Sequence, residues 1–194
     1  MMSLMNNCVS HFHYHRLSSE ESNNTLIPQI IELGKVVHLH IKDFVLDSVI
    51  GLSYGKRLII TGERIILNNI KREDIIEIID VDPVKKQVLY FGSASPARYT
   101  PLLYMIHYAK TEIQFLLFFS LKERMEKQFR LQSASQIKDE KTFMDLMKSI
   151  LTSLQTHENI IINSKYLIIT SLTKQRIEKT IEQVGEIIEN KWSG

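Results

Sequence analysis

Residues 50–75 read IGLSYGKRLIITGERIILNNIKREDI, and the prediction of the fold starts from this stretch. Leu58–Thr61 is rich in β-branched and apolar residues, which is typical of a strand. Gly62-Glu63 suits a two-residue hairpin turn, so residues 64–67 are expected to return as the partner strand. A further apolar stretch, residues 75–81, is expected to combine a short turn with a strand.

Helical and strand patterns alternate on either side of this stretch. Apolar residues that recur every three or four positions predict helices at residues 28–43, 102–109, 141–154 and 172–191. Short apolar runs predict further strands at residues 87–91, 115–119, 159–162 and 166–170. The predicted fold class is α/β, with a mostly antiparallel central sheet covered by helices.

Length and composition limit the classes of protein that fit. The 194 residues suit one domain, and the single cysteine, Cys8, excludes an intramolecular disulfide and suits a reducing compartment. The net charge is only +2, and basic residues are mixed with acidic ones, which is unlike a nucleic-acid-binding protein. No apolar run reaches the ~20 residues that span a bilayer, and no secretory signal is evident, so we expect a cytoplasmic protein without a membrane partner.

The first 25 residues differ in composition from the rest. They are rich in Ser, Asn and His and show little apolar periodicity, so residues 1–25 are expected to be a disordered leader with a short extended piece near His11–His15. Residues 26–194 are then the folded domain.

Two ungapped blocks of sequence carry motifs that resemble those of one known family. The first block runs from Asp43 to Asp80, where the family has Gly-Asn-x-Ser, Thr-Pro-Ser-Gly, two spaced leucines and Glu-Asp-Ile/Val. The residues at these places are Ile50-Gly51-Leu52-Ser53, Thr61-Gly62-Glu63-Arg64, Leu67, Ile70 and Glu73-Asp74-Ile75.

The second block runs from Ser95 to Ser120 and follows the family's Pro-Ser-Ser-Glu, Pro-Leu-His and Val-Val-His-x-His elements. This chain has Pro96-Ala97-Arg98-Tyr99, Pro101-Leu102-Leu103 and Leu116-Leu117-Phe118-Phe119-Ser120 at these places. A third, looser block places Ile161-Ile162-Asn163-Ser164-Lys165 against Leu-Arg-Asn-His-Gly. On these residues the chain resembles the class II aldolase/adducin family. The resemblance covers residues 43–188, apart from residues 121–140, and implies a three-layer class II aldolase/adducin-like domain.

The same resemblance indicates that the catalytic metal is absent. Class II aldolases use a divalent metal, usually zinc, to polarise a carbonyl group, and imidazoles hold that metal. The three histidine positions are Phe118, Ser120 and Ser164 in this chain, and the loop carboxylate is Tyr99. Glu63-Arg64 stands in the phosphate cradle, where the family has small residues. We therefore expect no cofactor.

Several polar residues would gather around the former pocket if the fold is right. They are Ser53, Thr61, Ser93, Ser95, Arg98, Tyr99, His107 and Lys165. Arg98 could hold an anion, and Tyr99 and His107 could pair as weak candidates for proton transfer. The alternative is that these side chains hydrogen-bond to loop backbone.

Two sets of alternating histidines need separate interpretations. His11, His13 and His15 would share one side of an extended segment and could ligate zinc or nickel, but in a mobile leader we expect adventitious binding only. A leader folded back onto the former pocket stays an open alternative. His38 and His40 imitate the family's His-x-His, yet in a helix residues two apart point away from each other, so partly exposed helix histidines are expected.

Two functional hypotheses remain. The first is a non-catalytic pseudo-aldolase with a structural or interaction role; the resemblance implies a homo-oligomer, commonly a tetramer, with the former site at a subunit interface. The second is an enzyme of altered chemistry, an aldolase or epimerase type without the zinc site, that acts on a small phosphorylated or carboxylated carbonyl compound. Arg98, Tyr99, His107 and Lys165 are its candidate residues. Fold alone does not decide between them.

Overall fold

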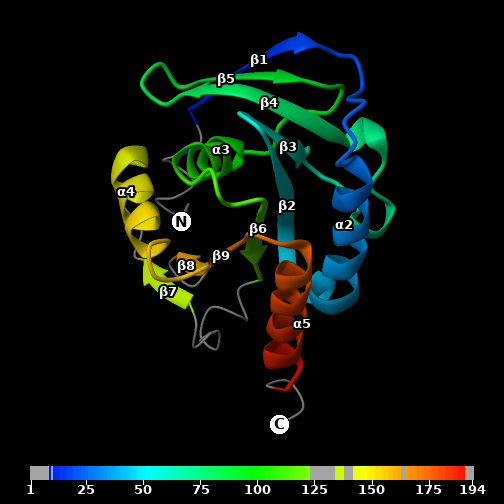
Figure 1. The fold of residues 1–194 in the computed structure, drawn as a ribbon, viewed down its shortest axis with the longest axis vertical. Coiled ribbons are helices and arrows are strands. Elements are labelled where there is room, and N and C mark those ends of the chain that lie inside the picture. Colours follow the sequence, from blue (N-terminus) through cyan, green and yellow to red (C-terminus); the bar gives the residue numbers. More distant parts are fainter. Residues whose placement is uncertain (1–8, 10, 123–133, 138–141, 163–164, 191–194) are drawn as a thin grey trace.

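The computed structural model describes residues 9, 11–122, 134–137, 142–162 and 165–190. Nine strands of these residues form one sheet in the order β1-β5-β4-β3-β2-β6-β9-β8-β7 (Figure 1). The strands are β1 (His13–Ser18), β2 (Val45–Tyr54), β3 (Arg57–Thr61), β4 (Ile75–Asp82), β5 (Gln87–Phe91), β6 (Phe115–Leu121), β7 (Ala134–Ile137), β8 (Asn159–Ile162) and β9 (Tyr166–Ser171). The α-helices are α2 (Ile27–Ile41), α3 (Thr100–Ala109), α4 (Phe143–Ser153) and α5 (Lys174–Asn190).

The sheet is mixed, which corrects the prediction of a mostly antiparallel sheet. β1 pairs with β5 and β7 pairs with β8 in parallel, while the pairs between them are antiparallel. Both parallel pairs lie at the edges and involve segments, residues 1–25 and 121–140, in which no strand pairing was expected. The prediction therefore failed at the edges because the two edge strands lacked a recognisable apolar pattern.

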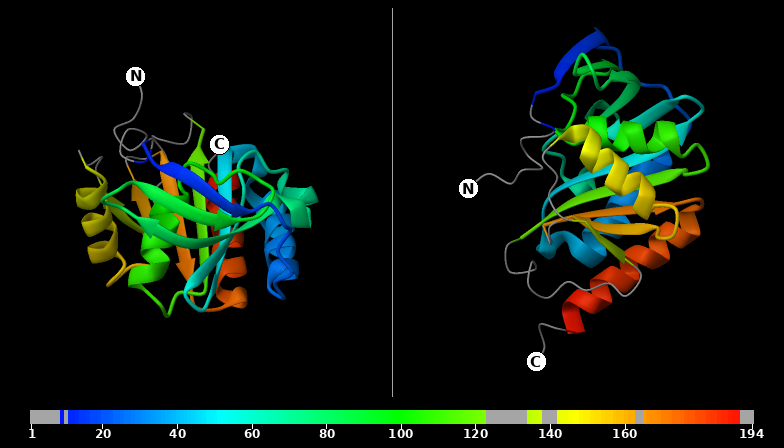
Figure 2. Two further views of the ribbon diagram at one scale, coloured as in Figure 1. Left: turned by 90° about the horizontal axis from the view of Figure 1, so that it is seen from above. Right: turned by 90° about the vertical axis from the view of Figure 1, so that its left-hand side faces the viewer.

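Helices cover both faces of the sheet and make three layers. α2 and α5 pack on one face and share a core with Ile59, Leu117 and Phe119. α3 and α4 pack on the other face, where Phe118 belongs to the core. Figure 1 shows the two pairs of helices on opposite sides of the strands, and Figure 2 turns the molecule so that the layers can be followed from two other directions.

The sequence accounts for the start and the buried stripe of the first long helix. Pro28 lies in the first turn of α2, where a missing amide proton costs nothing. Ile30, Leu33, Val37 and Ile41 follow at spacings of three or four residues and are all buried. The predicted helix over residues 28–43 is thus confirmed, with residues 42–44 continuing as a 3-10 turn.

The hairpin predicted at Gly62-Glu63 is wrong. β3 instead pairs with β2 through the turn that contains Gly55, whose φ of +59° suits glycine. The predicted partner strand, residues 64–67, is a loop that leads into a 3-10 turn, Leu67–Asn69. The glycine is needed for a close approach and not for a turn, because a Cβ added at Gly62 would lie 2.7 Å from the Cβ of Ala94.

Part of the expected leader belongs to the sheet. β1 pairs with β5 from His13 to Ser18, and Phe12 is buried in the α3/α4 core. Ser22 donates a hydrogen bond to Glu77 of β4, which fixes the connection between β1 and α2. Residues 1–8 and 10 lie outside the described residues, so disorder there stays a prediction. No helix in the described part of the chain is long and apolar enough to cross a membrane.

Candidate functional site

A pocket of about 450 Å³ lies at the N-terminal end of β2. Its walls come from the C-terminal part of α2, the start of β2, the loop after β3 and the residues just before α3. Charged side chains line it, and these are Lys42, Asp47, Glu63, Arg64 and Arg98, with the imidazole of His38 beside them. The pocket coincides with the place where the sequence resemblance puts the substrate site.

The loop after β3 is held by its own backbone. The amide of Gly62 donates to the carbonyl of Asp74 at 2.7 Å, and the amide of Glu63 donates to the carbonyl of Ser95 at 2.9 Å. The buried Thr61 hydroxyl accepts a hydrogen bond from the amide of Ile50 at 3.1 Å. Two amides of the loop that the resemblance aligns with a phosphate cradle are thus occupied, and Thr61 has a structural role.

Arg64 ends this loop in a backbone conformation that favours glycine. Its φ is +57°, in the left-handed region, where a residue with a Cβ loses about 1–2 kcal/mol. The resemblance places the glycine of Thr-Pro-Ser-Gly at this position. The loop therefore keeps a conformation suited to glycine although an arginine occupies it, and that arginine lines the pocket.

Asp47 is a pocket carboxylate that the sequence interpretation missed. The pocket walls partly desolvate it, which raises its pKa; the hydrogen bond from the amide of Ser48 lowers the pKa, and the charges of Glu63 and Arg98 act in opposite directions. In the β2–β6 register Asp47 lies opposite Ser120, so both project from the same face of the sheet. The sequence gives no register between β2 and β6, so it contains no signal that relates Asp47 to Ser120, the residue that the resemblance aligns with a metal ligand.

Three aromatic rings fill the position that the resemblance assigns to the metal. Tyr99 and Phe118 stack with their centroids 4.0 Å apart, and Tyr166 lies 5.7 Å from both. All three are buried, with exposures of 6%, 0% and 4%. Burial, reinforced by the charge and the hydrogen bond of Tyr166, raises the pKa of Tyr99 above its usual range.

These residues do not fit a zinc ion. Zinc takes thiolate, imidazole or carboxylate ligands. A phenyl ring at Phe118 offers none of these, Ser120 offers a neutral hydroxyl, and the raised pKa of Tyr99 keeps its phenol protonated. Ser164 lies outside the described residues. In the part of the chain that the structure describes, no group of three or more His, Cys, Asp or Glu could hold a metal ion.

The structure separates the two candidate proton-transfer residues. Tyr99 precedes α3, whereas His107 lies near its C-terminal end, eight residues or about 12 Å further on. The Ser53 hydroxyl lies 2.8 Å from Nδ1 of His107 and donates to the carbonyl of Ile113 at 2.6 Å. Ser53 and His107 thus form a pair of their own, away from the pocket that Arg98 and Tyr99 line.

The burial of His107 affects its protonation. Its side chain is 1% exposed, and desolvation lowers its pKa, against a smaller opposing effect of a hydrogen bond to the backbone of Lys56. Its ring packs edge-on against that of Tyr104, with the ring centroids 5.9 Å apart. These contacts indicate a neutral, structural histidine.

The side chain of one other candidate, Ser93, hydrogen-bonds to loop backbone, as the alternative interpretation expects. Ser93 donates to the carbonyl of Glu73 at 2.9 Å, and the backbone of Ser95 accepts from Glu63. Lys165 lies in the turn just before β9; its amide donates to the carbonyl of Ile162, and its carbonyl accepts from the amide of Leu121. Of the predicted set, only Arg98 and Tyr99 line the pocket.

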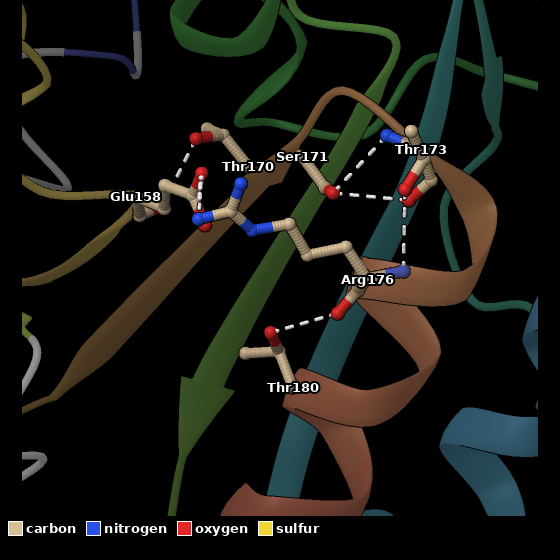
Figure 3. Close-up of polar contacts among 6 residues, drawn as sticks. All are labelled: Glu158, Thr170, Ser171, Thr173, Arg176 and Thr180. Atoms are coloured by element: carbon tan, nitrogen blue, oxygen red, sulfur yellow. Dashed lines mark hydrogen bonds and ion pairs between the residues drawn. The ribbon is translucent and has the colours of Figure 1, made fainter.

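A second, larger pocket of about 850 Å³ lies at the opposite end of the sheet. The polar side chains there bind each other and nearby backbone (Figure 3). Arg176 forms an ion pair with Glu158 at 2.8 Å, Thr170 donates to the carbonyl of Glu158, and Ser171 donates to the carbonyl of Thr173. This network holds the start of α5 against the β8–β9 pair and leaves the first pocket as the better candidate site.

Comparisons with known proteins test the resemblance. No protein-family model and no curated protein matches the chain. Among solved structures, the N-terminal class II aldolase domain of a conserved Thermoplasma acidophilum protein matches with a TM-score of 0.65 at 14% identity, over 89% of this chain and 96% of that one. A sugar-phosphate aldolase from Thermotoga maritima matches with a TM-score of 0.60 at 14% identity, over 88% and 97%.

L-fuculose-1-phosphate aldolase from Thermus thermophilus matches with a TM-score of 0.58 at 13% identity, over 87% of this chain and 96% of that one. The matched region spans nearly all of each neighbour, so the likeness covers the whole domain. At these low identities it concerns the fold and leaves the chemistry open. The predicted scaffold is confirmed: this chain has the class II aldolase fold.

Proposed function

We propose that this protein is a non-catalytic pseudo-aldolase that uses the class II aldolase fold as a ligand-binding or interaction domain in a homo-oligomer. The observation that carries the proposal is the stack of Tyr99, Phe118 and Tyr166 at the metal position. A buried aromatic cluster supplies no Lewis acid, and the proton-transfer pair suggested by the sequence is not assembled. Loss of all these features together is easier to explain by loss of catalysis than by a redesigned reaction.

The pocket beside the stack supports a retained binding role. Arg64 and Arg98 offer guanidinium groups suited to a phosphate or carboxylate, and both line a pocket large enough for a small molecule. The solved neighbours include a sugar-phosphate aldolase and an L-fuculose-1-phosphate aldolase. A small phosphorylated or carboxylated carbonyl compound is therefore the ligand class to test first.

Exposed apolar residues support the homo-oligomer. Leu46, which lines the pocket, is 67% exposed, and Ile66, on the adjoining loop, is 64% exposed. Contact with a second copy would remove such side chains from water, which is the usual driving force for association. Light scattering coupled to size-exclusion chromatography tests this, with a tetramer as the expected species and a monomer as the result against it.

The decisive test measures metal content and turnover on the purified, tag-free chain. We expect no cleavage of L-fuculose 1-phosphate or other sugar phosphates, either before or after dialysis against zinc, so that turnover does not depend on the metal content. Binding of the same compounds is measured in parallel by calorimetry, with Arg98→Gln as the variant that weakens it. Zinc bound at one equivalent, together with cleavage that a chelator abolishes, would sink the proposal.

An enzyme of altered chemistry is the second candidate, and Asp47 favours it. Its place opposite Ser120 puts a carboxylate beside the position that the resemblance assigns to the metal. Its raised pKa suits a group that accepts and donates a proton there. Turnover that persists in chelator and is lost in Asp47→Asn, with binding retained, would establish this alternative. Equal turnover in Asp47→Asn and the native protein would exclude a role for this carboxylate.

A further inference from the structure

The histidines of β1 are placed differently from what the sequence interpretation assumed. The prediction of adventitious binding rested on a mobile leader, but His13 and His15 lie in β1, which pairs with β5 along its length. Register pairs His13 with Gln87 and His15 with Leu89. The amide of His13 also donates to the carbonyl of Lys86 at 2.7 Å, which fixes the start of the strand.

Strand geometry places both imidazoles on one face. Tyr14, between them, packs against the α3/α4 core, so His13 and His15 point away from that core. Both are exposed. Their Cα atoms lie about 6.8 Å apart at two strand residues, a separation that two converging imidazoles can bridge with one ion. No described residue forms a hydrogen bond or ion pair with either ring.

We propose that His13 and His15 form a two-histidine chelate on the edge strand for a transition-metal dication such as Cu²⁺, Ni²⁺ or Zn²⁺. Neutral imidazole is a borderline donor that suits these ions and not Mg²⁺ or Ca²⁺. The chain supplies two ligands, in keeping with the lack of any three-residue group among the described residues. Water completes the coordination. Because pairing with β5 already orders the strand, binding an ion costs less conformational entropy than it would in a free leader.

α2 offers a matched control in the same chain. His38 and His40 have the same spacing but lie in a helix, where residues two apart point in different directions. Both pairs are partly or fully accessible, so a nonspecific effect of histidine number would appear equally at each.

The test titrates Cu²⁺ and Zn²⁺ into the full, tag-free chain by calorimetry, with Cu²⁺ electron paramagnetic resonance to count nitrogen ligands. We expect one site with two nitrogens, and at least about tenfold weaker binding in His13→Gln and in His15→Gln, because even an outer partner of a bound imidazole is worth about 10- to 100-fold. His38→Gln/His40→Gln should bind within about twofold of the native protein. Circular dichroism confirms that each variant is folded.

Three outcomes would overturn the proposal. One is the same affinity in native, His13→Gln and His15→Gln chains. Another is an equal loss in the helix control, which indicates an adventitious ion only. The third is no binding by the native chain at 100-fold excess of metal. The first and third results do not bear on the pseudo-aldolase proposal, because His13 and His15 do not line its pocket; a loss confined to the helix control would instead place an ion at the pocket that His38 lines.

Discussion

Replacing Phe118 by leucine tests whether the aromatic stack holds the core at the former metal position. The ring of Phe118 is fully buried and contacts both Tyr99 and Tyr166. Leucine keeps most of the volume and removes the two ring contacts, each worth about 0.5–1.5 kcal/mol. We therefore expect Phe118→Leu to lower the free energy of unfolding by about 1–3 kcal/mol. Phe118→Ala should cost about 3–5 kcal/mol, because a cavity is left as well.

Phe119 provides the matched control one residue further along β6. It is equally buried but faces the α2/α5 core, where it has no ring contact with any described residue. Phe119→Leu is then a volume-conserving change that should cost less than about 1.5 kcal/mol. Urea unfolding followed by circular dichroism at 25 °C measures both, with unchanged dependence on urea as the check that the native and unfolded states are comparable.

A double-mutant cycle with Tyr99→Leu isolates the ring contact from the rest. Coupling of about 0.5–1.5 kcal/mol between positions 99 and 118 is expected, since the two side chains stack directly. If Phe118→Leu costs no more than Phe119→Leu and the cycle is additive, the stack does not stabilise the site. The argument that aromatic packing replaced the metal would then lose its energetic basis.

Three further changes test other parts of the structure. Burial lowers the pKa of His107 in the folded state below its ordinary value of 6.5, so the unfolded chain binds a proton at this histidine at a higher pH than the folded chain does. The contribution of His107 to the free energy of unfolding should therefore be complete above pH 6.5 and decrease as the pH falls towards the folded pKa. In His107→Gln, urea unfolding at several pH values should lack this pH dependence. Arg64→Gly should leave stability unchanged or raise it by up to about 1 kcal/mol, because it relieves a left-handed conformation, whereas Ile65→Gly should lower it in the same unfolding assay. Gly34→Ala should lower the melting temperature although alanine favours helices, because the new Cβ would clash with Cδ1 of Ile70 and lie 2.7 Å from the carbonyl oxygen of Leu67. Lys35→Ala, at the exposed neighbouring position, should not lower the melting temperature.

The elements with strong periodicity could be predicted from the sequence, and the edges could not. Strand β5, residues 87–91, and the late helix have patterns that local chemistry alone sets, and both appear as expected. β1 contains three charged or imidazole residues that read as solvated leader, because only one of its faces meets a core. Its pairing with β5 depends on a contact about 70 residues away in the chain, and no local pattern encodes that contact.

The candidate site divides in the same way. Arg98 and Tyr99 could be found because the resemblance fixes their positions in an ungapped block, and the pocket contains both. His107 looked functional as a lone histidine in a helix, but the strand that faces it supplies Ser53, and the two satisfy each other. Asp47 was missed since its relation to Ser120 exists only in the register between β2 and β6.

The loop after β3 has the backbone geometry that the proposed loss of catalysis would leave in place. Its bonds to Asp74 and Ser95 and the left-handed φ of Arg64 are features of the backbone, and they are present although only Thr61 among residues 61–64 matches the Thr-Pro-Ser-Gly that the resemblance implies. Backbone geometry is fixed by packing on both sides, such as the close approach of Gly62 to Ala94, and so resists change. A side chain whose only role is to bind a metal or a phosphate is not fixed by packing, so it can be replaced once that ligand is no longer bound. The aromatic stack at the metal position and the arginine in the cradle are therefore what the fold should accumulate if catalysis has been lost while the domain is still needed for binding.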